Sequence, residues 1–182
     1  CGCILFKDPA VGKFYKHDSP YTYFTSDDLH LGEISLECSR AGAAAVALWT
    51  TMKAYPPQRG GEFAHSLNTC HAAAMKLFQR IQSDSRFIPL FTPEIDIVVW
   101  GVLGKSLVEM SEKAKIVFDE AAKRNLHLAL IKYPARLLPG HWSDIEINSE
   151  YVTCLRSCLM KAEHYEYIDT LWAQLLEVIN EV

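Results

Sequence analysis

The chain has 182 residues, of which 49% are hydrophobic and 22% charged, so it is long and apolar enough to fold around a buried core. Its formal net charge of -4 at pH 7 and the absence of a Lys or Arg cluster argue against nucleic-acid binding. No apolar run has the length of a membrane-spanning helix, so we expect a soluble, cytoplasmic protein without a membrane partner.

The first part of the chain combines a short apolar segment, a long polar segment and a helix. Gly2–Lys7 has the composition of a buried strand, and residues 16–33 predict a long loop. Residues 41–55 are almost all small or apolar, which predicts a helix buried on most sides and ended by Pro56 and Pro57. The predicted strand has no upstream partner within the chain, so we expect something outside the chain to complete it.

The remainder of the chain, beyond a Gly60-Gly61 hinge, alternates predicted helices and strands. The expected helices are 61–82, 106–124 with Ser106 as its N-cap, and 165–179; the expected strands are 87–91, 95–103, 126–132 and 151–160. The first two strands are close enough to form a hairpin. This order of elements predicts an α/β unit in which an antiparallel sheet has helices on one face.

The six cysteines show no pattern typical of a metal site, because the sequence has no pair of Cys-x-x-Cys elements and no histidine at zinc-finger spacing. We therefore expect no bound metal. Cys154 and Cys158 have an even separation, which places both on one face of a predicted strand. We interpret the cysteines as small hydrophobic residues of a reducing compartment.

Three segments together resemble one enzyme family. Leu36-Glu37-Cys38-Ser39-Arg40 before a small-residue helix is the most specific, and Gly2–Asp8 and Leu155-Arg156 before a terminal helix accompany it. They are similar to segments of the group II pyridoxal-phosphate-dependent (PLP-dependent) amino-acid decarboxylases, the glutamate and aromatic amino-acid decarboxylase family. The resemblance covers nearly the whole chain.

The resemblance implies an aspartate-aminotransferase-type fold, fold type I, of which the chain is the C-terminal portion. Residues 1–58 would be the end of the large PLP-binding domain, including the active-site loop and a linking helix, and residues 59–182 the small α/β domain. Family members are homodimers with active sites at the subunit interface. Their Schiff-base lysine lies upstream of the segment similar to Gly2–Asp8, so we expect this chain to need a lysine-bearing upstream portion and to be inactive alone.

The resemblance also implies site residues. Arg156 matches the arginine that pairs with a substrate carboxylate in glutamate-type members, a task that suits the rigid guanidinium fork. Tyr21 or Tyr23 matches the loop tyrosine that protonates the substrate carbon after carbon dioxide departs. Cys38, Ser39 and Arg40 match a turn that approaches the cofactor phosphate. The structural alternatives are a surface charge for the arginine, an aromatic anchor for the loop, and a plain helix N-cap for Ser39.

Two other functions remain open at this point. One is a PLP-dependent carbon-carbon lyase of the same superfamily, which would yield an aldehyde. The other is a non-catalytic α/β interaction module that never binds the cofactor. Within the decarboxylase interpretation the substrate is a small amino acid whose identity stays open, because the pocket walls that distinguish amino acids are largely upstream in the family.

Overall fold

The computed structural model describes residues 5–16 and 42–181, and the chain divides into two compact units, Cys1–Pro57 and Gln58–Val182. In the first unit, η1 (Pro9–Tyr15) is a 3-10 helix whose N-terminus is capped by the Asp8 carboxylate, which accepts the Ala10 N–H at 2.8 Å. Leu5–Lys7 contains no strand, so the prediction of a strand over Gly2–Lys7 is wrong for these three residues. Its other residues lie outside the described ranges.

Helix α2 (Gly42–Ala54) matches the predicted helix but not its predicted burial. None of its residues is buried, and its large apolar side chains Val46, Trp49 and Met52 are 61%, 63% and 48% exposed. An all-round apolar helix is typical of a buried position. The described residues therefore do not bury α2 as its composition predicts.

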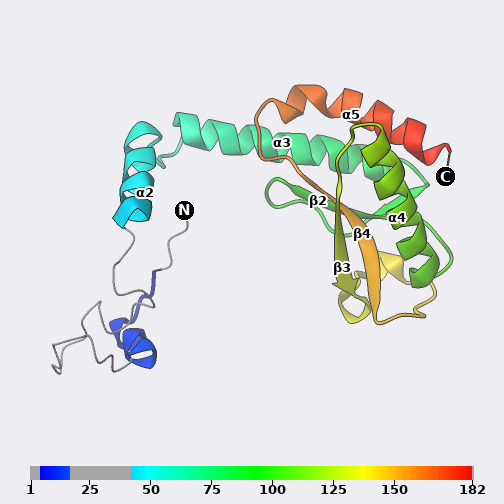
Figure 1. Ribbon diagram of the computed structural model, residues 1–182, viewed down its shortest axis with the longest axis horizontal. Helices are drawn as coiled ribbons and strands as arrows, with labels where there is room; N and C mark the ends of the chain where they lie inside the picture. The colour runs from blue at the N-terminus through cyan, green and yellow to red at the C-terminus, as the bar shows by residue number, and fades with distance from the viewer. Residues whose placement is uncertain (1–4, 17–41, 182) are drawn as a thin grey trace. The chain divides into compact units, whose positions relative to one another are not determined.

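The second unit is a four-stranded antiparallel sheet with three helices (Figure 1). Its elements in chain order are α3 (Glu62–Gln82), β1 (Phe87–Pro89), β2 (Ile97–Val102), α4 (Leu107–Lys123), β3 (Ala129–Pro134), β4 (Tyr151–Cys158) and α5 (His164–Ile179), with the 3-10 turns η2 (Ala135–Leu137) and η3 (Gly140–Trp142) before β4. The strand order is β1-β2-β4-β3, and each neighbouring pair is antiparallel. The expected α/β class, the β1–β2 hairpin and the antiparallel sheet are confirmed.

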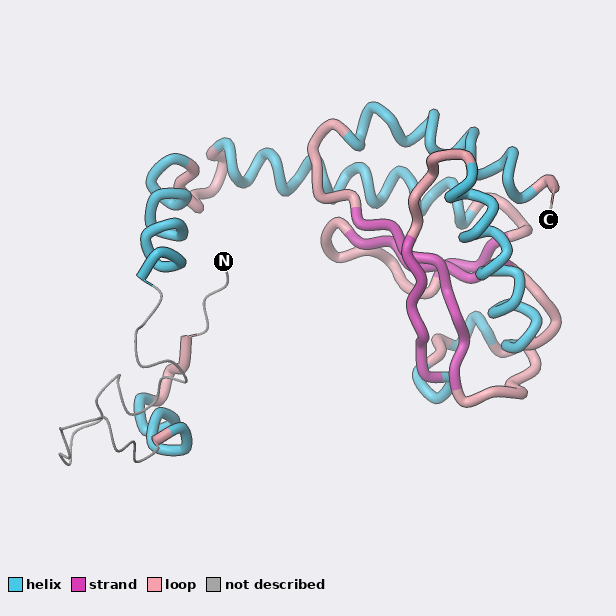
Figure 2. The backbone as a smooth tube through the Cα atoms, viewed as in Figure 1, coloured by secondary structure: helices cyan, strands magenta, loops and turns pink. Residues whose placement is uncertain are grey.

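Helices α3 and α5 lie side by side over the sheet, and the strands form one continuous layer beside them (Figure 2). The main core lies between these layers, where Val98, Trp100 and Leu155 of the sheet pack with α3, α4 and α5. A second, smaller core on the opposite face joins Val99 and Cys154 to Trp142 of η3. Helices therefore cover one face of the sheet, and the other face is covered in part by short turns and by Leu107 and Met110 at the start of α4.

Helix α4 begins five residues after the end of β2, and one of its side chains accepts a hydrogen bond from β4. The Ser106 hydroxyl accepts the Glu109 N–H at 3.3 Å, which confirms Ser106 as the N-cap. One turn later the Ser111 hydroxyl accepts the Thr153 N–H of β4 at 2.9 Å and donates to the Leu107 carbonyl at 2.6 Å. A side chain thus satisfies a strand N–H beyond the last residue of β2 that pairs with β4.

The predicted element boundaries differ from the observed ones mainly around β3. The prediction of 126–132 starts too early, because Asn125 adopts a positive φ of 60° and Leu126 donates back to the Ala121 carbonyl at the end of α4. Gly60 has a φ of 76°, which favours glycine at the predicted hinge. The other predicted helices and strands of this unit agree with the structure to within about two residues at each end.

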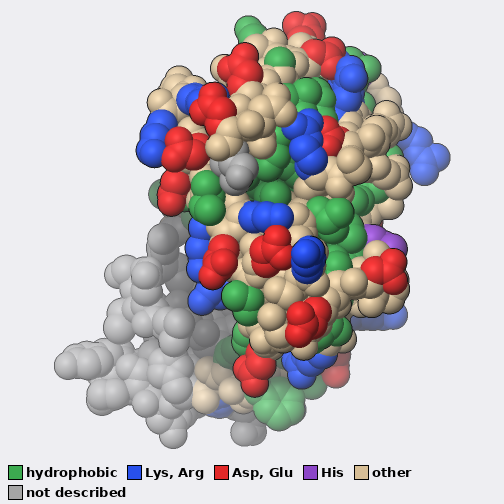
Figure 3. Space-filling model, turned by 90° about the vertical axis from the view of Figure 1, so that its right-hand side faces the viewer, with side chains coloured by type: hydrophobic (Ala, Val, Ile, Leu, Met, Phe, Trp, Pro, Cys, Tyr) green, Lys and Arg blue, Asp and Glu red, His purple; other side chains and the backbone are tan. Residues whose placement is uncertain are grey.

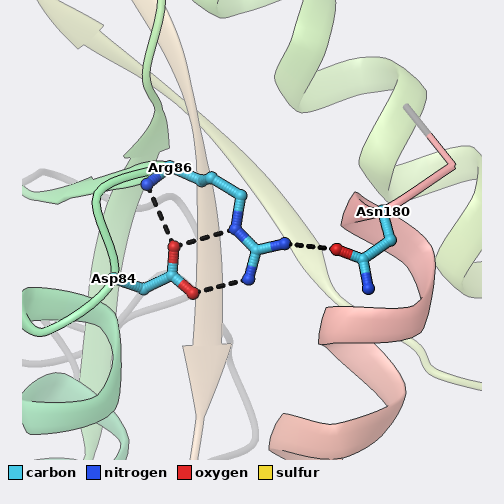
Figure 4. Close-up of polar contacts among 3 residues, drawn as sticks. All are labelled: Asp84, Arg86 and Asn180. Carbon is cyan, nitrogen blue, oxygen red and sulfur yellow. Dashed lines mark hydrogen bonds and ion pairs between the residues drawn. The ribbon is translucent and has the colours of Figure 1, made fainter.

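Surface charges of both signs lie close together on the face drawn in Figure 3. The surface ion pairs of the second unit include those of Lys76 and Arg80 with Asp169, at 2.8 Å each. Near the C-terminus, Arg86 links Asp84 to Asn180 at the end of α5 (Figure 4). Among the described helices, none combines the length and apolar character that crossing a bilayer requires.

Candidate functional site

Arg156 is the one predicted site residue that falls within the described ranges, and it occupies the middle of the sheet. It pairs with Val99 of β2 on one side and with Ala129 of β3 on the other. Backbone pairing on both sides holds the residue at a fixed register. The side chain therefore starts from a rigid position, as a binding residue requires.

The pleat of β4 places the Arg156 side chain on the face away from the helices. Leu155 points into the core beneath α3 and α5, and successive side chains of a strand point to opposite faces. Arg156 consequently shares its face with Cys154, which belongs to the smaller core. This face has no covering helix among the described elements near Arg156.

The guanidinium group of Arg156 has a buried donor without a partner among the described residues. The residue is half-buried, its Nε is shielded from solvent, and that atom has no hydrogen-bond acceptor among the described residues. A buried donor without a partner costs on the order of 1 to 3 kcal/mol, and more when the group is charged. The geometry thus favours an anionic acceptor that the described residues do not supply.

Cys154, on the same face, does not supply that anion. Burial raises the pKa of the Cys154 thiol to about 12, so it stays neutral at physiological pH. Cys158, four residues after Cys154 on the same strand, is half-buried. A carboxylate is a suitable acceptor for the Arg156 guanidinium, because it can accept two parallel hydrogen bonds from one guanidinium.

A cavity of about 320 Å³ lies on the other side of β4, between the sheet and the helices. Its lining includes Leu77 of α3, Trp100 of β2 and Leu175 of α5. Arg156 is also among the lining residues, together with Ala129, its pairing partner on β3. The cavity therefore lies next to Arg156.

The other predicted site residues lie outside the described ranges. They are Tyr21 and Tyr23 of the predicted loop and Cys38, Ser39 and Arg40 of the predicted phosphate turn. The structure consequently brings none of them together with Arg156, and their roles stay predictions. Sequence reasoning gave no weight to Trp100, whose unpartnered indole N–H is a second notable polar group of the sheet.

No family model matches the sequence, and no curated protein matches it either. Solved structures do match. Mouse CSAD covers 95% of the chain at 15% identity with a TM-score of 0.60, and 4-hydroxyphenylacetaldehyde synthase from Rhodiola rosea covers 83% at 14% identity with a TM-score of 0.61. Tryptophan decarboxylase from Catharanthus roseus covers 76% at 14% identity with a TM-score of 0.54. The chain has the fold of the C-terminal portion of group II PLP-dependent decarboxylases.

The chain spans only part of each of these proteins. It matches 35% of the mouse CSAD chain, 29% of the Rhodiola synthase and 26% of the Catharanthus decarboxylase. In each of them the matching part is about a third of the longer chain or less.

Proposed function

We propose that this chain is part of a PLP-dependent decarboxylase that removes the α-carboxylate of an L-amino acid as carbon dioxide. The observation that carries the proposal is the Arg156 guanidinium, which has a buried, unpartnered Nε on the central strand of a unit with this fold. In support, Leu155-Arg156 stands on β4 before the terminal helix α5, and this segment resembles the family's Leu-Arg strand before its last helix.

In this proposal Arg156 binds a carboxylate of the amino acid. Two parallel N–H donors hold the carboxylate in one plane and so fix the orientation of the substrate. The rigid register of β4 limits how far the guanidinium can move, which reduces the entropy lost on binding. Lysine would keep the charge but could not provide the fork.

The remaining site residues are proposed from the resemblance. Cys38, Ser39 and Arg40 would bind the cofactor phosphate, and Tyr21 or Tyr23 would donate a proton to the substrate carbon after carbon dioxide leaves. When bound, PLP supplies the electron sink that decarboxylation needs. The residue that fits this chemistry on structural grounds is Arg156, because its unpartnered donor suits a carboxylate.

We also propose that a lysine-bearing upstream portion completes the enzyme, that the complete enzyme is a homodimer, and that it acts in the cytoplasm. The fold match to about a third of the mouse CSAD chain supports the missing portion. The chain alone would then be inactive. Borohydride reduction in the presence of PLP, followed by intact-mass analysis, tests this: an adduct on this chain would contradict the absence of a cofactor lysine.

Release of carbon dioxide from carboxyl-labelled amino acids by the complete enzyme tests the function itself. The substrates should include acidic, aromatic and diamino acids, because the chain does not identify the substrate. We expect Arg156→Lys to lower kcat/KM at least about tenfold, the loss of roughly 1.4 kcal/mol of binding. Arg136→Lys is the matched control, since Arg136 is an exposed arginine in η2, just after β3. Equal activity of both variants would refute the role of Arg156.

A further inference from the structure

The neighbours of Arg156 on its own face of the sheet are all uncharged. Residues paired directly across antiparallel strands share a face, and so do residues two apart on one strand. By this register the neighbours are Ile97 and Val99 of β2, Cys154 and Cys158 of β4, and Ala129 and Ile131 of β3. Ile97, Val99, Ile131 and Cys154 belong to the smaller core or pack against it. The sheet therefore gives the arginine no counter-charge at these positions.

The two flanks of Arg156 differ in how much space they leave. Val99 and Ala129 pair with Arg156 from opposite sides, so each Cβ lies about 4.5–5.5 Å from the Arg156 Cβ. Val99 is only 1% exposed and fills its flank as part of the smaller core. Ala129 is half-buried, carries only a methyl group, and lines the cavity of about 320 Å³ together with Arg156. The flank towards β3 is therefore the open one.

Ala129 is the smallest member of its row on β3. Ile131 and Tyr133 follow it at intervals of two residues on the same face, and both pack against the smaller core. Larger, β-branched residues are favoured in strands, so strand propensity does not explain the alanine. The sheet order ends at β3, so the space beside Ala129 is not closed by a further strand of the described sheet.

We propose that Ala129 is a specificity-determining residue for the carboxylate that Arg156 binds. Its methyl group leaves room beside the guanidinium for the body of the molecule that carries the carboxylate, and its size sets how bulky that body can be. The inference rests on the proposed function and adds a size limit to the role of Arg156. A longer side chain at position 129 would occupy the open flank and reject bulky carboxylates while still admitting small ones.

Nuclear magnetic resonance of the arginine Nε–Hε groups of the ¹⁵N-labelled chain tests the proposal. The Arg156 signal is assigned by its loss in Arg156→Lys. The probes are acetate and pivalate, which share the carboxylate but differ in bulk, because pivalate has a tert-butyl group in place of the methyl group. We expect both probes to shift the Arg156 signal of the wild-type chain in a saturable manner.

Two variants at position 129 measure the size limit. We expect Ala129→Leu to weaken pivalate at least about tenfold more than acetate. Ala129→Val has a shorter side chain that suits a strand, so it should change the preference in the same direction but less, and it serves if the leucine variant does not fold. Ala72→Leu makes the same change at an exposed alanine of α3 and should leave both affinities unchanged. The backbone amide spectrum shows whether each variant is folded.

The outcomes separate this inference from the proposed function. If the folded variants at position 129 weaken both probes equally, or weaken neither, the size limit is wrong although Arg156 still binds carboxylates. If neither probe moves the Arg156 signal of the wild-type chain, the carboxylate role of Arg156 is contradicted, and the inference is overturned with it.

Discussion

Asp84 and Arg86 form a bidentate ion pair in the turn between α3 and β1. The Asp84 carboxylate accepts from Arg86 Nε at 2.9 Å, from Nη2 at 2.6 Å and from the Arg86 backbone N–H at 3.0 Å (Figure 4). Arg86 Nη1 also donates to the Asn180 side chain at 2.5 Å. One carboxylate thus orders the guanidinium that connects the turn to the end of α5.

This pair predicts a stability that depends on pH. The side-chain hydrogen bonds from Arg86 lower the pKa of Asp84 below its ordinary value. A carboxylate with a lowered folded-state pKa stabilises the fold above its unfolded pKa of about 3.9, and this contribution is lost as the pH falls through the lower folded value. We expect Asp84→Asn to lower the free energy of unfolding by about 1 kcal/mol at pH 7. The loss should become smaller as the pH falls towards 2.5.

Urea unfolding of wild type and Asp84→Asn between pH 7 and pH 2.5 measures the difference. Asp144→Asn is the control, because Asp144 is exposed in the segment after η3. A difference between wild type and Asp84→Asn that stays constant across this range would contradict the prediction.

A second prediction concerns Ser111, whose hydroxyl accepts the Thr153 N–H of β4 where β2 no longer pairs with this strand. Ser111→Ala leaves the Thr153 N–H without its acceptor in a residue that is only 7% exposed. We expect a loss of about 1 to 3 kcal/mol in the free energy of unfolding. Ser83→Ala removes a hydroxyl that only donates to the Gln79 carbonyl at the exposed end of α3 and should cost less than half as much. Equal losses would show that the Thr153 contact is unimportant.

Gly101 of β2 tests the packing of the smaller core. A Cβ at this position would lie 2.6 Å from Met110 Cε and 2.8 Å from Trp142 Cη2. The end of a methionine can move, but the Trp142 ring is buried and held by its hydrogen bond to Pro89. We expect Gly101→Ala to destabilise the fold by about 1 to 3 kcal/mol. Gly140→Ala, which meets nothing within 4 Å, should change the thermal midpoint little.

Thiol labelling distinguishes the two cysteines of β4. Burial raises the pKa of Cys154 to about 12 and leaves little thiolate, whereas Cys158 is half-buried on the same strand. We expect iodoacetamide at pH 8 to modify Cys158 well before Cys154 in the folded chain, and both at similar rates in urea. Peptide mass spectrometry follows each site. Faster reaction of Cys154 in the folded chain would show that the strand opens.

Much of the second unit could be predicted from local patterns. The helical periods of α3 and α5, the Ser106 cap and the apolar strands β2 and β4 all have short-range signals, and these agree with the tertiary packing. The start of β3 has no such signal, because apolar residues continue from Leu126 while the chain is still closing α4 through Asn125. The Leu126 N–H donates to the Ala121 carbonyl, and this hydrogen bond keeps Leu126 out of the strand despite its apolar surroundings in the sequence.

The candidate site could be predicted only in part. Arg156 follows Leu155 in a segment that resembles a known family, which is why the sequence singles it out, and its role as a site residue stays a prediction. The face to which it points depends on the pairing of β4 with β2 and β3, which involves residues about 27 and 57 positions away (156 minus 129 and 156 minus 99). The isolated N–H of Trp100 has no sequence signal at all, because the absence of a partner is a property of the packed core.

The double pairing of β4 has a consequence for both faces of the sheet. Leu155 and Arg156 are adjacent, and a slip of the strand by one residue would exchange the faces to which they point. The arginine would then enter the apolar layer beneath α5, and a leucine would take its place on the open face. Pairing with β2 on one side and β3 on the other therefore keeps the Arg156 charge out of the apolar core.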